Sequence, residues 1–230
     1  MSTTAAPAVE PRYMRQGDIL PAARMAQLKV MVIGCGAVGS LIAKQLAHIG
    51  QTHVTLCDFD TVDEVNLCCQ GFIDADLGQN KVDAVAEAMV QINSTLRGGQ
   101  INPINARFRK SDGIKHDVIF CCVDKIDTRK FIFNAVKDSS LAFFDARVKG
   151  GDSIRILSAT DAKSRAHYAA TLFAPEEVQA GECTAKMTIY GAFVAAGILM
   201  SRYSLFLRRF PICDPDVMIN LAGMELAVME

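Results

Sequence analysis

The sequence contains no tryptophan, and aromatic residues make up only 7% of its 230 residues. Neither sign of charge is in excess, because 24 lysines and arginines stand against 25 aspartates and glutamates, for a formal net charge of −1. Proteins that bind nucleic acid by neutralising phosphates have a clear basic excess, so we expect no nucleic-acid partner. Half of the residues are hydrophobic, which is sufficient for a buried core.

Signals for secretion and for membrane insertion are also missing. The N-terminal stretch MSTTAAPAVEPRYMRQ has no apolar centre and does not resemble a secretory signal. The longest nearly uncharged run lies between Lys186 and Arg202 and has fifteen intervening residues, fewer than the roughly twenty needed to cross a bilayer. We therefore predict a buried helix in this run and no membrane partner.

Eight cysteines occur, but their spacing is not that of a disulfide framework or a structural zinc site. No C-x-x-C pair is present, and four of the cysteines are neighbours in the sequence, as Cys68–Cys69 and Cys121–Cys122. Free thiols are typical of a reducing compartment, so we expect a cytoplasmic protein.

What the sequence does contain is a regular alternation of strand-like and helix-like segments. Short apolar runs are separated by stretches with helical spacing of their apolar residues, which predicts an α/β fold with a Rossmann-like, mostly parallel sheet flanked by helices. Strands are expected over residues 29–33, 53–57, 101–105, 117–123 and 141–146, and helices over 38–49, 81–92, about 128–137 and 184–206.

The pattern changes after Gly150–Gly151. Ser153–Ala159 and Ala166–Phe173 alternate more loosely, and we expect both as additional antiparallel strands in the C-terminal half. The tail from Pro211 onward is ambiguous. No low-complexity linker divides the chain, so we predict an N-terminal arm and helix over residues 1–28 and a single domain over 29–230.

The segment GCGAVG follows a strand and opens a helix, the context in which G-x-G-x-x-G predicts a nucleotide site. Gly34 permits the tight turn, Gly36 lets the backbone approach a phosphate, and Gly39 lets the helix pack on the strand. Asp58 follows nineteen residues after Gly39, at the end of the second strand, where a carboxylate can accept hydrogen bonds from ribose. The loop alone does not choose between NAD, FAD and ATP.

Residues beyond the loop favour a nucleoside triphosphate. The chain has no Tyr-x-x-x-Lys pair for a dehydrogenase and no Walker sequence. Lys81 opens a helix and can contact a phosphate, and Asp124 ends the fourth strand, where a carboxylate can hold Mg²⁺. The ordinary alternatives are a solvated lysine and a helix N-cap, but together with the loop these residues converge on one pocket.

Several motifs resemble those of the ThiF/MoeB/HesA-type adenylating enzymes, which are related to the ubiquitin-activating enzymes. They are RYMRQ (Arg12–Gln16), the glycine loop, DFDTVDEVNLCCQ (Asp58–Gln70), GQNK ending at Lys81, and CCVDKIDTR ending at Arg129. The similarity extends from about residue 12 to residue 203. It implies ATP-dependent adenylation of a carboxylate, with ATP and Mg²⁺ as cofactors.

The resemblance assigns roles to the matched positions. Asp58 would hold the ribose of ATP, Lys81 the phosphates and Asp124 the magnesium ion. The remaining matched polar residues would line the nucleotide pocket: Asp60, Asn66 and Gln70.

The resemblance also implies a homodimer, in which Arg15 reaches the partner's ATP as an arginine finger. Without the resemblance, a solvated N-terminal segment would be the preferred interpretation. The implied substrate is the C-terminal glycine of a ubiquitin-like or sulfur-carrier protein that ends in Gly-Gly. Alternatives are a small-molecule, peptide or tRNA-linked carboxylate, and a non-catalytic subunit of a heterodimer.

One position departs from the family pattern, because Cys69 stands where the family usually carries arginine. A guanidinium that would bind phosphate oxygens is therefore missing. Lys125, Arg129 and Arg147 are other cations that could compensate. The departure predicts either weaker ATP binding or an altered reaction.

Cys183, in the segment GECTAK, precedes the long apolar helix and resembles the cysteine before the last long helix of ThiF-like proteins. A helix N-terminus favours the thiolate, and Lys186 one turn later would add to this effect. We consider Cys183 a candidate nucleophile that forms a thioester, and an inert buried cysteine is the alternative.

Overall fold

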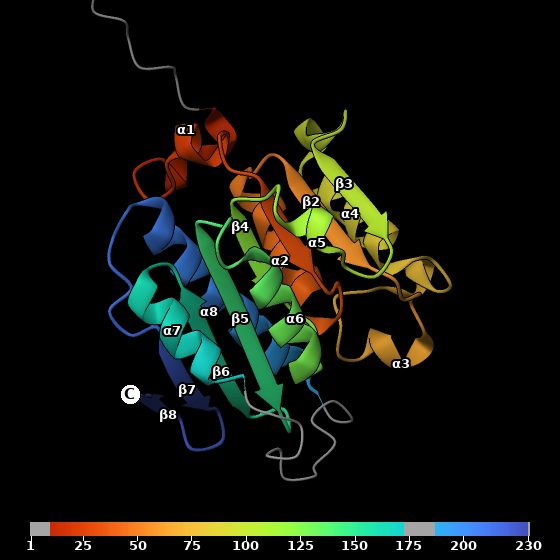
Figure 1. Cartoon of the computed structure of the whole chain (residues 1–230). Coiled ribbons are helices and arrows are strands. Elements are labelled where there is room, and N and C mark those ends of the chain that lie inside the picture. Colours follow the sequence, from red (N-terminus) through yellow and green to blue (C-terminus); the bar gives the residue numbers. More distant parts are fainter. Residues whose placement is uncertain (1–9, 173–186, 230) are drawn as a thin grey trace, which may run out of the picture.

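Eight strands form one mixed sheet in the computed structural model, which describes residues 10–172 and 187–229 (Figure 1). The strand order is β3-β2-β1-β4-β5-β6-β7-β8, and the first five strands in this order are parallel. The last three are antiparallel to their neighbours, which confirms the predicted fold class. The strands are β1 (Val30–Ile33), β2 (Val54–Asp58), β3 (Ile101–Asn105), β4 (Val118–Cys121), β5 (Ala142–Lys149), β6 (Ser153–Ala159), β7 (Asp216–Asn220) and β8 (Glu225–Val228).

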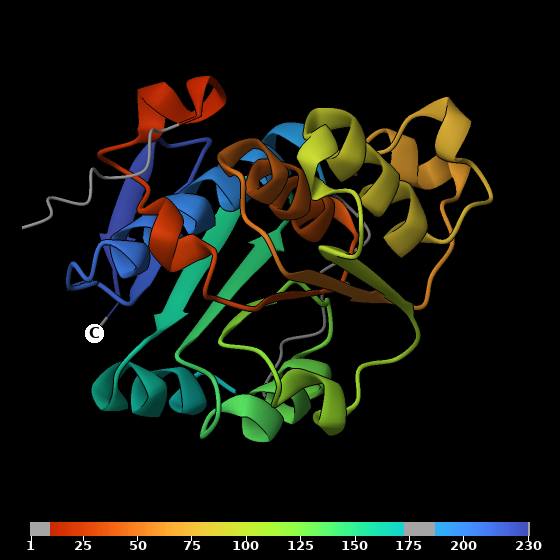
Figure 2. The ribbon, with the colours of Figure 1, turned by 90° about the horizontal axis from the view of Figure 1, so that it is seen from above.

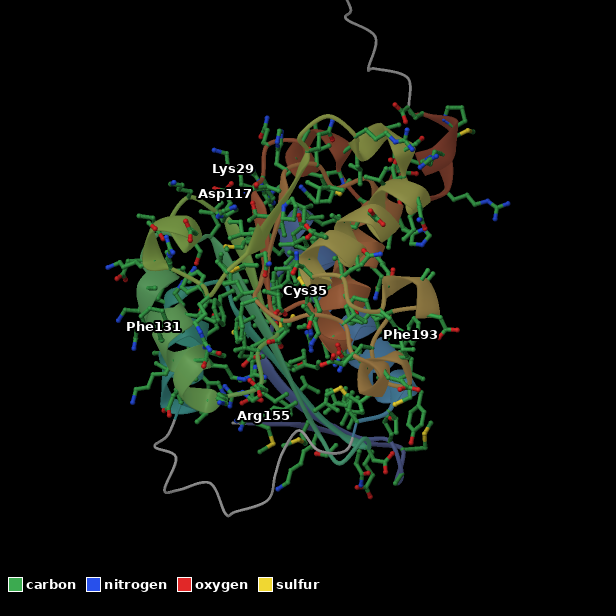
Figure 3. The ribbon with its side chains drawn as sticks, turned by 90° about the vertical axis from the view of Figure 1, so that its right-hand side faces the viewer. Lys29, Cys35, Asp117, Phe131, Arg155 and Phe193 are labelled. Carbon is green, nitrogen blue, oxygen red and sulfur yellow. The ribbon has the colours of Figure 1, made fainter. Side chains whose placement is uncertain are left out.

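Helices cover both faces of this sheet (Figure 2). One layer consists of α2 (Ala37–Ile49), α4 (Lys81–Ile92) and α8 (Ile189–Leu207). The other contains α5 (Lys110–Gly113), α6 (Ile126–Val136) and α7 (Ala162–Ala170), so that Phe131 of α6 and Phe193 of α8 lie on opposite sides in Figure 3. Shorter elements complete the described chain: η1 (Pro11–Gln16), α1 (Ala22–Met25), α3 (Glu64–Leu67), η2 (Asp74–Asp76) and η3 (Ser94–Leu96).

The parallel strands are buried on both faces, as strands between two helix layers must be. In β1, Val30 and Val32 belong to the core beneath α2, α4 and α8, whereas Met31 and Ile33 belong to the core beneath α6 and α7. This two-residue alternation explains why the strand is a continuous apolar run in the sequence.

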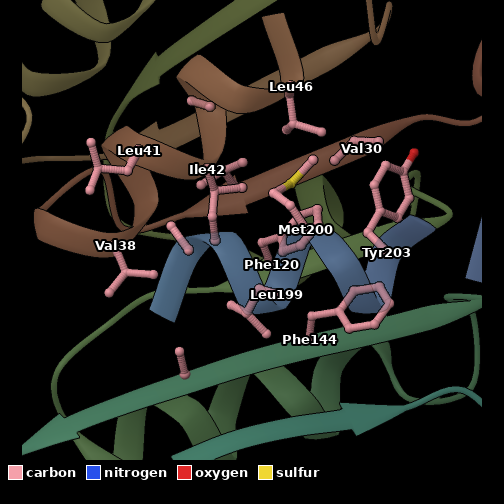
Figure 4. Close-up of a cluster of buried hydrophobic side chains, with 14 of the residues drawn as sticks. Val30, Val38, Leu41, Ile42, Leu46, Phe120, Phe144, Leu199, Met200 and Tyr203 are labelled. Atoms are coloured by element: carbon pink, nitrogen blue, oxygen red, sulfur yellow. The ribbon is translucent and has the colours of Figure 1, made fainter. Parts of the chain in front are cut away.

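The larger core holds α8 against the sheet through aromatic contacts (Figure 4). The rings of Phe120 and Phe144 stack with centroids 5.3 Å apart, and Tyr203 meets Phe120 edge-on at 5.6 Å. The Tyr203 hydroxyl donates a hydrogen bond to Gln51 Oε1 at 2.7 Å, so its buried polar atom is satisfied. Within the described chain, α8 is the single helix whose length and apolar composition would suffice to cross a bilayer. Its packing confirms the predicted core helix.

The prediction of a strand over Ala166–Phe173 was wrong, because residues 166–170 belong to α7; Phe173 lies outside the described residues. The helix begins after Asp161, whose side chain accepts a hydrogen bond from the Ser164 N–H at 2.8 Å. This N-cap and the four alanines of α7 favour a helix, whereas the expectation of a strand relied on a weak alternation of apolar residues. The ambiguous tail supplies β7 and β8 instead.

Candidate active site

A cleft of about 660 Å³ opens at the carboxyl ends of β1, β2 and β4. Here the chain has wound outward from β1 through β2 to β3 on one side and from β4 to β5 on the other, and ligands bind at such a switch in strand order. Seven of the site residues predicted from the sequence line the cleft: Gly34, Gly36, Asp58, Asp60, Gln70, Lys81 and Asp124.

The glycine loop forms the floor between β1 and α2, where Figure 3 labels Cys35. Gly34 has a φ of +90°, and a Cβ there would lie only 2.6 Å from the carbonyl oxygen of Cys122, the residue after β4. Both features require glycine at this position. A Cβ at Gly39 would overlap the carbonyl oxygen of Gly34. At Gly36 the nearest atom to a Cβ would be Gln70 Oε1, at 3.7 Å, so the backbone is open to the cleft. Within residues 10–172 and 187–229, no side chain caps the N-terminus of α2, which leaves its first N–H groups available to an anion.

Asp58 joins the end of β2 to this loop. Its Oδ2 accepts a hydrogen bond from the Cys35 N–H at 2.6 Å, and its Oδ1 accepts one from the Asp60 N–H at 2.9 Å. Both bonds hold the carboxylate in place at the cleft. A carboxylate held in this way can still accept hydrogen bonds from hydroxyl groups, because each oxygen has further lone pairs.

Lys81 and Gln70 form a polar wall beside the loop. Lys81 is 7% exposed, and its Nζ lies 3.4 Å from Asp60 Oδ2. Gln70 Oε1 is buried and has no hydrogen-bond partner within the described residues. Because buried polar atoms are nearly always paired, this amide is suited to contact a polar ligand in the cleft.

Asp124 follows β4 and is exposed, with Asp127 and Thr128 of α6 beside it in the cleft lining. Its Oδ1 accepts a hydrogen bond from the Lys125 N–H at 2.8 Å. Carboxylate oxygens suit Mg²⁺, which keeps waters and phosphate oxygens as further ligands. Over residues 10–172 and 187–229 no cluster of three metal-ligating side chains occurs, so a metal ion here would depend on ligands from a bound nucleotide.

Three predicted site residues lie elsewhere. Gly39 is buried in α2, and Asn66 caps α3 by accepting a hydrogen bond from the Asp63 N–H at 3.0 Å. Arg15 is exposed in η1, which is attached to the far end of α2 because Gln16 Nε2 donates to the Ile49 carbonyl at 2.8 Å. A helix of thirteen residues is about 20 Å long, so Arg15 is distant from the glycine loop of its own chain.

Cys183 lies outside the described residues. The expected helix over residues 184–206 begins later than predicted, at Ile189, because Thr188 is its N-cap and accepts a hydrogen bond from the Gly191 N–H at 3.3 Å. The N-cap of α8 thus comes five residues after Cys183 in the sequence, and the role of Cys183 as a nucleophile stays a prediction. Met187, four residues after Cys183, does line the cleft.

Cys69 lines the cleft at the position of the missing arginine. Burial raises the pKa of its thiol, and neither the thiol nor the thiolate carries positive charge, so Cys69 replaces none of the missing guanidinium charge. Arg129 and Arg147 are unable to compensate, because both bind the buried carboxylate of Asp145 and neither lines the cleft. Of the three cations considered from the sequence, Lys125 is the one in the cleft lining.

An aromatic end of the cleft was not anticipated. Phe59 follows β2 directly, and the Arg107 guanidinium lies 4.1 Å from the centroid of its ring. Phe108 and Phe131 meet edge-on at 6.0 Å, and all four residues line the cleft. Arg107 and Phe108 come just after β3, so the rule that strand ends form the site would have located them in the sequence.

The comparisons with known proteins agree on one family. The sequence model of the ThiF family matches residues 16–207. Molybdopterin-synthase adenylyltransferase of Escherichia coli (strain K12) is 33% identical over 106 residues, which are 44% of this chain and 41% of that protein. Ubiquitin-like modifier-activating enzyme 5 of Aedes aegypti is 29% identical over 147 residues, which are 58% of this chain and 37% of that protein. This chain thus spans about two fifths of the length of these relatives.

Solved structures show the same fold. Crystalline E. coli MccB with AMPCPP and MccA superposes with a TM-score of 0.74 at 18% identity and covers 96% of this chain and 71% of that chain. PaaA superposes with a TM-score of 0.75 at 16% identity and covers 98% of this chain and 85% of that chain. At these identities the likeness establishes the fold alone.

Proposed function

Because this chain belongs to the ThiF family, we propose that it is an ATP-dependent adenylyltransferase that activates a carboxylate. The observation that carries the proposal is the cleft, which brings an open glycine backbone, the Asp58 carboxylate, Lys81 and Asp124 into one space. These groups come from segments far apart in the sequence. Together they offer what a nucleoside triphosphate needs: an acceptor for ribose, N–H groups and a cation for phosphates, and a carboxylate for a metal ion.

In the proposed reaction, ATP binds as a substrate with its ribose at Asp58 and its phosphates at the glycine loop and Lys81. A carboxylate oxygen of the second substrate attacks the α-phosphorus, and the bond from that phosphorus to the oxygen bridging the β-phosphate breaks. Pyrophosphate leaves with the bonding electrons, and an acyl-adenylate remains. Lys81 stabilises the charge of the departing group. Asp124 would hold Mg²⁺, which would further neutralise the phosphate charge.

The second substrate we favour is the C-terminal carboxylate of a ubiquitin-like or sulfur-carrier protein that ends in Gly-Gly. The names of relatives support this choice, since they include a ubiquitin-like modifier-activating enzyme and a molybdopterin-synthase adenylyltransferase. A peptide C-terminus is the second candidate, because MccB, which shares the fold over nearly this whole chain, was crystallised with MccA.

Free thiols at all seven described cysteines are compatible with a cytoplasmic enzyme.

We further propose that the enzyme is a homodimer in which Arg15 contacts the partner's ATP. The position of η1 supports an action in trans, because Arg15 lies at the opposite end of α2 from its own glycine loop. After adenylation, the Cys183 thiolate is proposed to attack the acyl carbon of the acyl-adenylate, so that a thioester forms and AMP leaves. It is four residues from Met187 in the cleft lining, and four residues span at most about 14 Å.

The test is ATP–pyrophosphate exchange with a panel of Gly-Gly-ending proteins, peptides and free acids. Adenylation would be supported by exchange that depends on one substrate and is lost in Asp124→Ala. The control is Asp138→Ala, at an exposed site after α6, which should keep the exchange. Mixing Arg15→Ala with Asp124→Ala should restore exchange, because a mixed dimer has one cleft with both residues intact. A Cys183→Ser variant should adenylate without forming the thioester. Absence of exchange with every substrate, despite ATP binding, would favour a non-catalytic subunit.

A further inference from the structure

The aromatic end of the cleft has a composition different from the rest of the site. Phe59 is 50% exposed and Phe131 is 55% exposed, although large apolar side chains are usually buried. Arg107 is also exposed, and over residues 10–172 and 187–229 no carboxylate lies within ion-pair distance of it. The guanidinium therefore lies over the Phe59 ring and has no acid of the described chain as an ion-pair partner.

The position of this pair relative to Asp58 indicates what it contacts. β2 and β3 are parallel neighbours, with Asp58 opposite Asn105, so Phe59 and Arg107 follow these strand ends side by side. On the other side of Asp58 lies the glycine loop, since the Cys35 N–H donates to its carboxylate. A nucleotide with its ribose at Asp58 and its phosphates at the loop must direct its base toward Phe59 and Arg107.

We propose that Arg107, oriented by Phe59, stacks on the nucleobase of the bound nucleotide and sets how tightly the base is held. This proposal rests on the proposed function and specifies how the same cleft holds the base of its nucleotide. A planar guanidinium stacks on flat aromatic systems, and an ammonium group does not. Contact of an aromatic ring on one face and a base on the other would desolvate the cation, which strengthens such interactions. Phe108 and Phe131 form the facing apolar wall.

The role can be separated from simple attraction of phosphates by charge. If Arg107 stacks on the base, Arg107→Lys should bind the nucleotide as weakly as Arg107→Ala does, because lysine retains the positive charge but has no planar group to stack. If Arg107 acts by charge alone, Arg107→Lys should behave as the unmodified protein. Phe59→Leu keeps an apolar side chain but removes the ring, and a smaller loss in the same direction is expected. Arg109→Ala is the matched control, because Arg109 is exposed on the same loop and does not line the cleft.

The experiment is isothermal titration calorimetry of each full-length variant with ATP, AMP and inorganic tripolyphosphate. Arg107→Ala and Arg107→Lys should bind ATP and AMP roughly tenfold more weakly, the usual size of one base stack, while tripolyphosphate binding and the thermal unfolding midpoint stay unchanged. Unchanged ATP affinity in Arg107→Ala, or equal losses for ATP and tripolyphosphate, would overturn the stacking role and leave adenylation intact. If the unmodified chain bound no adenine nucleotide, the proposed function would fail and this proposal with it.

Discussion

The buried carboxylates of this protein and the carboxylates of its cleft have different surroundings. Asp145 and Asp216 are fully buried, and each accepts hydrogen bonds or ion pairs from at least two side chains. Asp60 is half exposed, and Asp124 is exposed and accepts, within the part of the chain that the structure describes, one hydrogen bond from a backbone N–H. The difference separates charges that hold the fold together from charges that are free to meet a ligand.

The two buried groups connect the antiparallel part of the structure. Asp145 of β5 binds Arg129 of α6 and Arg147, and it accepts a hydrogen bond from the Tyr168 hydroxyl of α7 at 3.0 Å. Asp216 of β7 accepts two hydrogen bonds from Arg155 of β6, at 2.9 and 2.6 Å, and one from His167 at 2.7 Å. An unpaired charge in either place would be costly, so these groups act as structural links.

The largest effect is expected at Asp145. Asp145→Ala leaves the buried Arg129 without its counter-ion, and breaking a buried pair in this way typically lowers the free energy of unfolding by about 3–5 kcal/mol. Urea unfolding followed by circular dichroism measures the change. Asp124→Ala is the comparison, because removal of an exposed carboxylate should alter stability by less than about 0.5 kcal/mol. Similar losses in the two variants would contradict the distinction between the two sets of charges.

The glycine loop should show an intermediate effect that depends on the position. Gly39→Ala places a Cβ against the Gly34 carbonyl oxygen and should lower stability by roughly 1–3 kcal/mol through overpacking. Gly36→Ala has room for its Cβ, so stability should change little while ATP affinity falls. Thermal unfolding with and without ATP distinguishes the two. A stable Gly39→Ala protein with full ATP affinity would refute the packing role.

The Asp216 cluster should make stability sensitive to acid. Burial by itself would raise the pKa of Asp216, but hydrogen bonds from Arg155 and His167 outweigh it and hold the pKa below its ordinary value. A carboxyl group whose pKa is lowered on folding stabilises the protein above its unfolded pKa of about 3.9, and this contribution is lost as the pH falls through the folded pKa. The unfolding free energy should therefore fall less steeply in Asp216→Asn between pH 5 and 2, measured by urea titration at each pH. An identical slope in both proteins would contradict the stabilising contribution of the ionised Asp216.

The smallest effect is expected for the ion pair at the cleft. Asp60→Asn removes the partner of Lys81, but half-exposed ion pairs contribute at most about 1 kcal/mol, so the unfolding free energy should change by less than that. ATP affinity should increase, and by more than stability changes, because Lys81 would then face phosphates without a competing carboxylate. Calorimetry with ATP provides the comparison. A stability loss as large as that of Asp145→Ala would place Asp60 among the structural charges.

The parallel half of the fold could be predicted from the sequence because its signals are local. Strands buried on both faces appear as apolar runs, and the glycine loop has a spacing imposed by backbone geometry at Gly34 and Gly39. The antiparallel half has weaker local signals. Few residues of α7 are buried, so its apolar pattern does not distinguish a helix from a strand, and its helical signal is the N-cap at Asp161.

By itself, the sequence determined the fold class, the glycine-loop end of the cleft and the family, since these follow from residue spacing along a strand–loop–helix unit. Tertiary structure alone decided which charged side chains are unpaired and can contact a ligand in the cleft. Arg129 and Arg147 appear in the sequence as available cations, and packing against Asp145 removes both from the cleft. It also brought Phe59 and Arg107 together across two neighbouring strand ends. The physical reason is that burial and pairing depend on neighbours in space, which residue spacing along the chain does not specify.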